Sequence, residues 1–197
     1  MKNGTDAGSP ARPLVVGIGG TTRVGSSTER ALRIALRAAE DAGAQAHLFD
    51  GPFLARLPLF APEKQERTEE QRQLVETVRQ ADGLIVASPG YHGSVSGLVK
   101  NALDLLEDLR EDKRSYLDDR AVGCIVTAAG WQAAVTTLES LRAIVHALRG
   151  WPTPFGATLN TTEKIFDFSG TCTDPKVTKQ LVTVGRQVVE FALQHGR

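Results

Sequence analysis

A loop rich in hydroxyl groups follows the first apolar segment of the chain. Residues 14–18 are apolar and residues 31–39 repeat alanine and leucine at helical spacing, so residues 19–27, the hydroxyl-rich loop, are predicted to connect a strand to a helix. Free amides and the helix dipole favour an anion at such a helix start. The side chains that add further donors there are Thr21, Thr22, Arg23, Ser26, Ser27 and Thr28. A phosphate is therefore the expected ligand.

The residues that this loop lacks narrow the kind of phosphate. Gly20 and Gly25 have the Walker A separation, but Ser26 replaces the lysine of that motif, which disfavours a nucleoside triphosphate. Gly17 and Gly19 begin a dinucleotide fingerprint that lacks its third glycine, which disfavours a pyrophosphate. The loop therefore suits a phosphate monoester. The alternative is that the hydroxyls only cap the helix. A helix cap uses one hydroxyl, so capping does not explain five hydroxyl side chains and an arginine in the same loop.

A second loop of small and aromatic residues follows the apolar segment 84–87. The strand is predicted to break at Ser88, and the next helix to start near Ser96. The residues presented between them are Pro89, Gly90, Tyr91, His92, Gly93 and Ser94. In a parallel sheet this loop would lie beside the hydroxyl-rich loop, at the carboxyl edge where ligands bind. Alone it could be an ordinary turn, but the pair of loops indicates a site with amides beside a flat aromatic surface.

The two loops resemble the NAD(P)H-dependent FMN reductases of the flavodoxin-like superfamily. Residues 20–26 are similar to that family's G-S-x-R-x-x-S pattern. Residues 89–104 are similar to its P-E-Y-x-G-S-x-x-G-x-L-K-N-A-x-D signature, with Gly90 in place of the glutamate. Weaker similarity extends through residues 57–59, Ala129, Gly130 and the helix that holds Leu141 and Arg142. The resemblance covers nearly the whole chain after residue 12.

This resemblance implies an FMN site. The residues implied for the phosphate are Thr21, Arg23, Ser26, Ser27 and Thr28; those implied for the ring are Pro89, Gly90, Tyr91, His92, Gly93, Ser94, Ala129, Gly130 and Trp131. NADPH or NADH would stack on the open ring face and pass a hydride to flavin N5, with backbone amides stabilising the charge. No side-chain acid or base is required, so no catalytic residue is assigned. Trp131 is expected either to flank the ring or to cover the sheet edge, and His92 either to assist near the ring or to pack on a neighbouring subunit.

The elements that position these loops alternate between strand and helix patterns, which is typical of a parallel sheet covered on both faces. Further strands are predicted over residues 44–50, 84–87, 121–128 and 154–159, the last at an edge because Pro152 and Pro154 cannot donate to a ladder. Further helices are predicted over residues 69–81, 96–109, 136–148 and 174–194. The fold class is therefore α/β, a flavodoxin-like three-layer sandwich with a five-stranded parallel sheet in the order 2-1-3-4-5.

Length and composition fit one compact unit. The chain has 197 residues and is 41% hydrophobic; a disordered lead-in is expected over residues 1–12 and one FMN-binding domain over residues 13–197. Equal numbers of basic and acidic residues, 23 of each, give no drive toward nucleic acid or a membrane surface. No apolar run approaches the roughly 18 residues of a membrane helix, and the start lacks a secretion-type segment, so a cytoplasmic protein is expected.

Other chemistries are disfavoured. The four histidines lack paired metal spacing, so no metal site is predicted, and Cys124 lies in an apolar strand as a core residue. Residues 93–97 imitate a hydrolase nucleophile elbow but place Val95 at its centre. The charged linker 106–120 is a candidate lid or subunit contact. The same linker and Arg142 are candidates to contact the 2′-phosphate of NADPH.

Three functions follow. The first is a reductase whose reduced FMN leaves to supply a partner flavin-dependent monooxygenase. The second holds FMN as a prosthetic group and reduces quinones, azo dyes or metal oxyanions. The third is a non-enzymatic electron carrier or interaction protein, which zero net charge disfavours. The first is the prediction. The resemblance also implies a homodimer or a dimer of dimers, with a candidate surface from Leu98, Leu105, Leu106 and Leu109.

Overall fold

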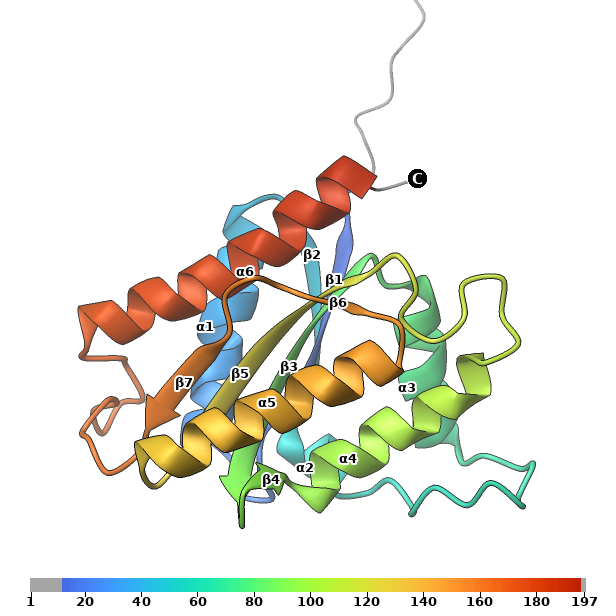
Figure 1. Cartoon of the computed structure of the whole chain (residues 1–197), viewed down its shortest axis with the longest axis horizontal. Helices are drawn as coiled ribbons and strands as arrows, with labels where there is room; N and C mark the ends of the chain where they lie inside the picture. Colours follow the sequence, from blue (N-terminus) through green and yellow to red (C-terminus); the bar gives the residue numbers. More distant parts are fainter. Residues whose placement is uncertain (1–11, 196–197) are drawn as a thin grey trace, which may run out of the picture.

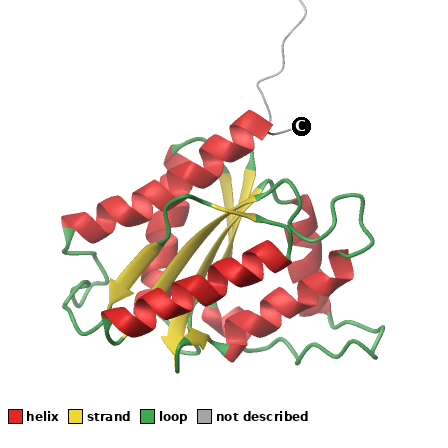
Figure 2. Ribbon diagram, viewed as in Figure 1, coloured by secondary structure: helices red, strands yellow, loops and turns green. Residues whose placement is uncertain are grey.

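The computed structural model describes residues 12–195, which form a twisted parallel sheet between two layers of helices (Figures 1 and 2). The main strands, in spatial order, are β2 (Gln45–Phe49), β1 (Leu14–Gly19), β3 (Gly83–Tyr91), β5 (Ala121–Ala128) and β7 (Ala157–Asn160). These strands are parallel to their neighbours. The expected order 2-1-3-4-5 is therefore confirmed.

Helices cover both faces of this sheet, as Figure 1 shows. On one face are α1 (Ser27–Asp41) and α6 (Pro175–His195); on the other are α3 (Glu69–Gln80), α4 (Gly97–Asp104), the 3-10 helix η1 (Leu105–Leu109) and α5 (Trp131–Ala147). Alternate strand residues point to opposite faces, so Ile85 packs with α1 and α6 while Leu84 and Val86 pack with α3 and α4. Because both faces of β3 and β5 are buried, one in each cluster, these strands are continuous apolar segments in the sequence.

The edge beside β5 differs from the prediction. Of the predicted strand 154–159, only residues 157–159 are in a strand, β7, and the short β6 (Trp151–Pro152) before it was not predicted. β6 pairs with the beginning of β5 and β7 with its end. Pro152 and Pro154 lack amide hydrogens, which limits pairing with β5 in the segment between β6 and β7. The edge position is correct, but the continuous strand is wrong.

The segment expected to break at Ser88 also differs. β3 continues to Tyr91, turns at His92 and Gly93, and returns as the antiparallel β4 (Ser94–Val95). The two turn residues have φ of 52° and 85°, as in the two-residue turn that suits a hairpin because both central residues have positive φ. The prediction treated Pro89 as a break, but proline is tolerated at a strand position where its nitrogen need not donate.

Three further differences concern helices and termini. α5 begins at Trp131, five residues before its predicted start, and a short helix α2 (Gly51–Leu54) was not predicted. The expected lead-in lies outside the described residues except for Arg12, which donates to the carbonyls of Gly43 and Ala44 at 3.0 and 2.6 Å. In the described part of the chain, no helix is both long and apolar enough to cross a membrane.

The surface suggested for subunit contact is mostly interior. Leu105, Leu106 and Leu109 are fully buried in the cluster that packs η1 beneath the sheet, and only Leu98 is partly exposed. Their spacing reflects packing within one chain, so these three leucines cannot supply a dimer surface. The oligomeric state itself stays a prediction.

Candidate functional site

Three connecting segments meet at the carboxyl edge of the sheet. Gly19 at the end of β1 lies beside Ala87 of β3, and Pro89 of β3 lies beside Thr127 of β5. The hydroxyl-rich loop, the β3–β4 hairpin (residues 88–96) and the β5–α5 loop (residues 129–131) therefore leave neighbouring strands at one edge, the lower edge in Figure 1. The sequence prediction that these segments lie together is confirmed by the topology, and such an edge is where ligands bind in doubly wound folds.

The hydroxyl-rich loop keeps several donors available. α1 begins at Ser27, so the amides of Ser27 and Thr28 have no acceptor within the helix. Arg23 and Thr22 are exposed, and the Arg23 amide donates to Thr21 Oγ1 at 3.2 Å, which folds the loop upon itself. Two amides, one guanidinium and neighbouring hydroxyls at the positive end of α1 are thus the groups that could hold an anion.

Two of the predicted phosphate hydroxyls are used inside the protein. Ser26 is the N-cap of α1 and its Oγ accepts the Glu29 amide at 3.3 Å. Thr28 Oγ1 lies 2.6 Å from Thr127 Oγ1, and both threonines are almost fully buried. Thr28 therefore attaches the start of α1 to β5, and Ser26 fixes the first turn of the helix.

The loop is packed tightly from the β2 side. A Cβ on Gly51, the first residue of α2, would lie 1.7 Å from the Thr21 carbonyl oxygen. Asp50 caps α2 by accepting the Phe53 amide at 3.0 Å. The β2–α2 turn therefore fixes the position of Thr21, and glycine is required at the contact.

The β3–β4 hairpin presents an exposed tip on a buried base. Ser88 is fully buried; its Oγ accepts the Ser96 amide at 3.0 Å and donates to the Pro89 carbonyl at 2.8 Å. Pro89 is buried as well, whereas His92 and Ser94 are exposed and Tyr91 is 55% exposed. Among the residues predicted to face a ring, the tip residues are accessible and Pro89 is not.

The absence of the family's glutamate at Gly90 has a packing cause. A Cβ there would lie 2.7 Å from Thr137 Oγ1 and 3.0 Å from Ala128 Cβ. Because α5 packs this closely, position 90 accepts no side chain without moving Thr137. Gly93 is different, since its Cβ would meet only Thr136 Cγ2 at 3.9 Å, and glycine is favoured there by the positive φ.

The β5–α5 loop is held by a residue that sequence reasoning missed. Asn160 Oδ1, at the end of β7, accepts the Gly130 amide at 2.9 Å and the Thr162 hydroxyl at 2.8 Å. Gly130 has φ of 112°, and Trp131 after it is 51% exposed. Ala129 is exposed too. Trp131 therefore stands at the rim of the site with half of its surface accessible.

Glu29 is the second residue that sequence reasoning missed. It is 4% exposed, and its Oε2 accepts the Gly25 amide at 2.9 Å while Arg33 donates to Oε1. The pattern of Ser26 followed three residues later by a glutamate is a capping-box signature, which could have identified this residue.

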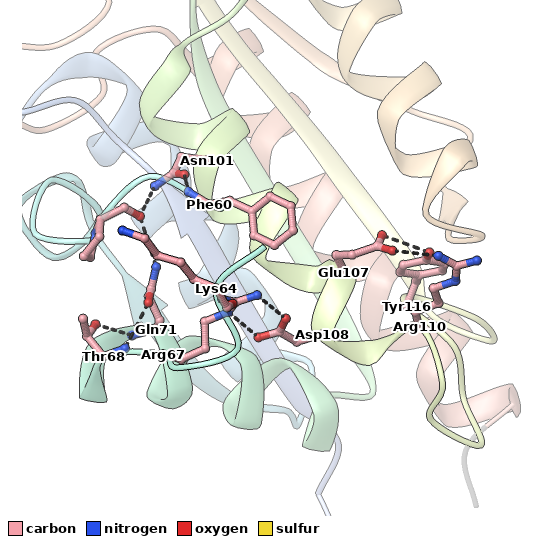
Figure 3. A network of polar contacts seen from close by, with 11 residues as sticks. Phe60, Lys64, Arg67, Thr68, Gln71, Asn101, Glu107, Asp108, Arg110 and Tyr116 are labelled. Carbon is pink, nitrogen blue, oxygen red and sulfur yellow. Dashed lines mark hydrogen bonds and ion pairs between the residues drawn. The ribbon is translucent and has the colours of Figure 1, made fainter. Parts of the chain in front are cut away.

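In the second half of the segment 89–104, Asn101 has a role in holding the fold together. The Asn101 side chain of α4 accepts the Phe60 amide at 2.7 Å and donates to the Pro58 carbonyl at 3.0 Å (Figure 3). Gln71 also donates to that carbonyl, at 3.2 Å. Figure 3 also shows the two hydrogen bonds of 2.8 Å from Arg67 to Asp108, which tie the next part of this loop to η1. Asn101 therefore anchors residues 57–60 rather than a ligand.

The other candidates from the sequence are placed away from the three segments or inside the protein. Arg142 donates to the carbonyls of Thr153 and Pro154 at 2.6 and 3.3 Å. The linker 106–120 leads to the amino end of β5, opposite the loops, so a lid over them is wrong. Cys124 is confirmed as a core residue, and burial raises its pKa to about 12. Among residues 12–195, no three His, Cys, Asp or Glu side chains are grouped as metal ligands would be.

The donor set fits a phosphate monoester that carries a flat ring. The candidate anion-binding groups lie at the start of α1, and the end of β3 and the start of α5 carry the exposed aromatic side chains of Tyr91 and Trp131. Glycines at positions 20, 93 and 130 leave backbone without side chains along this edge. FMN has this combination of groups.

The chain is similar in sequence and in fold to several known proteins. Residues 13–162 match the family described as NADPH-dependent FMN reductase. An FMN-dependent NADPH-azoreductase from Staphylococcus aureus is 32% identical over 142 residues, which cover 68% of this chain and 70% of the relative. Among solved structures, the flavoenzyme NAD(P)H:(acceptor) oxidoreductase FerB from Paracoccus denitrificans has a TM-score of 0.70 at 20% identity, over 94% of this chain and 100% of the other. A flavodoxin, WrbA-like protein from Agrobacterium tumefaciens has a TM-score of 0.60 at 16% identity, over 93% and 99%.

Proposed function

Since the chain belongs to the NADPH-dependent FMN reductase family, we propose that it reduces FMN with NADPH and releases the reduced flavin to a partner monooxygenase. It is an NAD(P)H-dependent flavin oxidoreductase, and FMN and NADPH are its cofactors. The release of the flavin, the partner and the residues of the site are the proposed part.

The chain's own contribution is binding and orientation. FMN, when bound, supplies the redox chemistry by accepting a hydride from the nicotinamide. The Ser27 and Thr28 amides, the Arg23 guanidinium and the exposed hydroxyls would hold its phosphate. Tyr91 to Ser94 and Ala129 to Trp131 would border its ring, with backbone amides rather than side chains facing the charge that develops. His92 and Trp131 are positioning groups in this proposal, and no side chain is assigned to proton transfer.

One observation favours a flavin that is released after each reduction over a flavin that stays bound as a prosthetic group. The hydroxyl-rich loop uses part of its donor set inside the protein, since the Thr28 hydroxyl pairs with that of Thr127. The Gly25 amide is likewise occupied by Glu29. Fewer donors then remain for a phosphate, and the affinity for FMN would be moderate. A moderate affinity suits a flavin that arrives oxidised and leaves reduced.

A second candidate is a reductase that retains FMN and reduces a flat aromatic acceptor. The named activity of the relative from Staphylococcus aureus, an azoreductase, favours it. The exposed aromatic surfaces of Tyr91 and Trp131 also favour it, because they could stack on such an acceptor.

Flavin retention separates the two. The purified protein is washed by ultrafiltration, and NADPH oxidation is followed at increasing FMN, with and without an azo dye or a quinone. The first proposal expects colourless protein and a rate that saturates with FMN. Yellow protein whose turnover needs the dye or quinone would favour the second candidate. Absence of both flavin binding and NADPH oxidation would contradict both.

A further inference from the structure

A buried carboxylate is bonded directly to the backbone of the hydroxyl-rich loop. Glu29 Oε2 accepts the amide of Gly25 at 2.9 Å, and Gly25 has φ of 67°. Only 4% of Glu29 is exposed, so its charge is close to the loop and poorly screened by water. The loop is thus held in a left-handed bend by a negatively charged side chain at the place where the anion would bind.

Arg33 supplies the opposing charge from the next turn of α1. Its Nε donates to Glu29 Oε1 at 2.9 Å, its Nη2 forms an ion pair with the same oxygen at 2.8 Å, and its side chain is 54% exposed. Arg33 Nη2 also lies 3.9 Å from Asp50 Oδ2, at the end of β2. The pair therefore has one buried negative member and one partly solvated positive member.

Helix capping does not account for this arrangement by itself. Ser26 already caps α1 by accepting the Glu29 amide. In a capping box the glutamate would return to the amide of the N-cap residue, whereas Glu29 reaches one residue further, to the loop. The carboxylate therefore removes one amide from the donors available to an anion and places a negative charge next to the remaining ones.

We propose that the Glu29–Arg33 pair sets the affinity of this loop for the phosphate of FMN, Glu29 weakening it and Arg33 strengthening it. This inference rests on the proposed function, because it requires that the loop binds the flavin phosphate. The effect should depend on the charge of the flavin. The pair changes the affinity for FMN, which carries the phosphate, and leaves the affinity for riboflavin, which lacks it, unchanged.

Two substitutions test the pair in opposite directions. In Glu29→Gln the amide oxygen keeps an acceptor for Gly25, the charge is lost, and Arg33 can turn toward Asp50. Dissociation constants for FMN and riboflavin are measured by flavin fluorescence titration at low and high salt. We expect Glu29→Gln to tighten FMN binding about ten-fold and Arg33→Gln to weaken it about ten-fold at low salt, with riboflavin unchanged and both effects smaller at high salt.

A matched control lies on the same helix. Glu40→Gln removes the same charge from the exposed Arg37–Glu40 pair, about 16 Å further along the axis at 1.5 Å per residue, and is expected to leave both affinities unchanged. An equal change for FMN and riboflavin, or no change for either, would overturn the inference. If Glu29→Gln does not fold, Arg33→Gln decides alone, because the side chain that it replaces is half exposed. Failure of the unaltered protein to bind any flavin would instead refute the proposed function.

Discussion

Two segments that resemble family motifs use similar residues in different ways. In the hydroxyl-rich loop, Arg23 and Thr22 stay exposed and the first amides of α1 have no helical acceptor. In the second segment, Ser88, Ser96 and Asn101 are buried and bond to the protein itself. Polar residues in a motif are therefore not equivalent. Those with satisfied hydrogen bonds build the scaffold, and those that lack protein partners are available to a ligand.

The largest expected effect is on stability, in the second segment. Asn101→Ala removes the acceptor of the part-buried Phe60 amide and a donor to the carbonyls of Leu57 and Pro58, so we expect the free energy of unfolding to fall by about 2–3 kcal/mol. Urea unfolding measures this loss. FMN affinity of the folded protein should change less than about two-fold, because Asn101 anchors residues 57–60.

The neighbouring Lys100 is the control for this prediction. Its ion pair with Asp104 is nearly half exposed, so Lys100→Gln should cost less than about 1 kcal/mol. A large loss of FMN affinity in folded Asn101→Ala would show that the comparison between the two segments is wrong.

A pair of glycines tests the packing of the hairpin. In Gly90→Ala the added Cβ would meet Thr137 and Ala128, so we expect a loss of about 1–3 kcal/mol. In Gly97→Ala the added Cβ meets nothing within 4 Å, so stability should be unchanged or slightly higher. Thermal unfolding of both variants is the measurement. Equal losses at the two positions would contradict the close approach of α5.

A substitution of Arg23 in the hydroxyl-rich loop should weaken FMN binding and leave the stability unchanged. Arg23 is exposed, so Arg23→Gln should leave the stability within about 0.5 kcal/mol of the unaltered protein. Loss of a charged donor should weaken FMN binding about ten-fold, equivalent to about 1.4 kcal/mol, and leave riboflavin unaffected. Fluorescence titration with both flavins tests this, with Arg37→Gln as a control of equal charge. Unchanged FMN affinity would remove Arg23 from the proposed site.

The smallest effect is expected for Thr28, a residue of the hydroxyl-rich loop whose hydroxyl is bonded inside the protein, as the polar side chains of the second segment are. The hydroxyls of Thr28 and Thr127 satisfy one another, so replacing both by valine should change stability by less than about 1 kcal/mol. FMN affinity should stay within about two-fold, since only the Thr28 amide would face the phosphate. A marked loss of FMN binding in the double variant, measured by the same titration, would make the Thr28 hydroxyl a ligand after all.

Much of the fold could be read from local pattern. The strand 121–128 was predicted with its observed bounds because it is a continuous apolar run, and the helix 69–81 to within one residue because its apolar residues recur at helical spacing. The hairpin and the early start of α5 were missed. A turn at His92–Gly93 and a helix whose N-cap residue is a glycine have weak local signals, and the packing of α5 against the hairpin decides both.

The sequence alone determined the order of the strands, the hydroxyl-rich loop and the likeness to flavin reductases, because these depend on residue type and spacing along the chain. Only the tertiary structure decided which polar side chains remain available. Thr28 meets Thr127, Gly130 meets Asn160 and Asn101 meets Phe60 across 30 to 99 residues. Hydrogen-bond partners so far apart in the chain leave no local pattern, and whether a donor is satisfied or free depends on them.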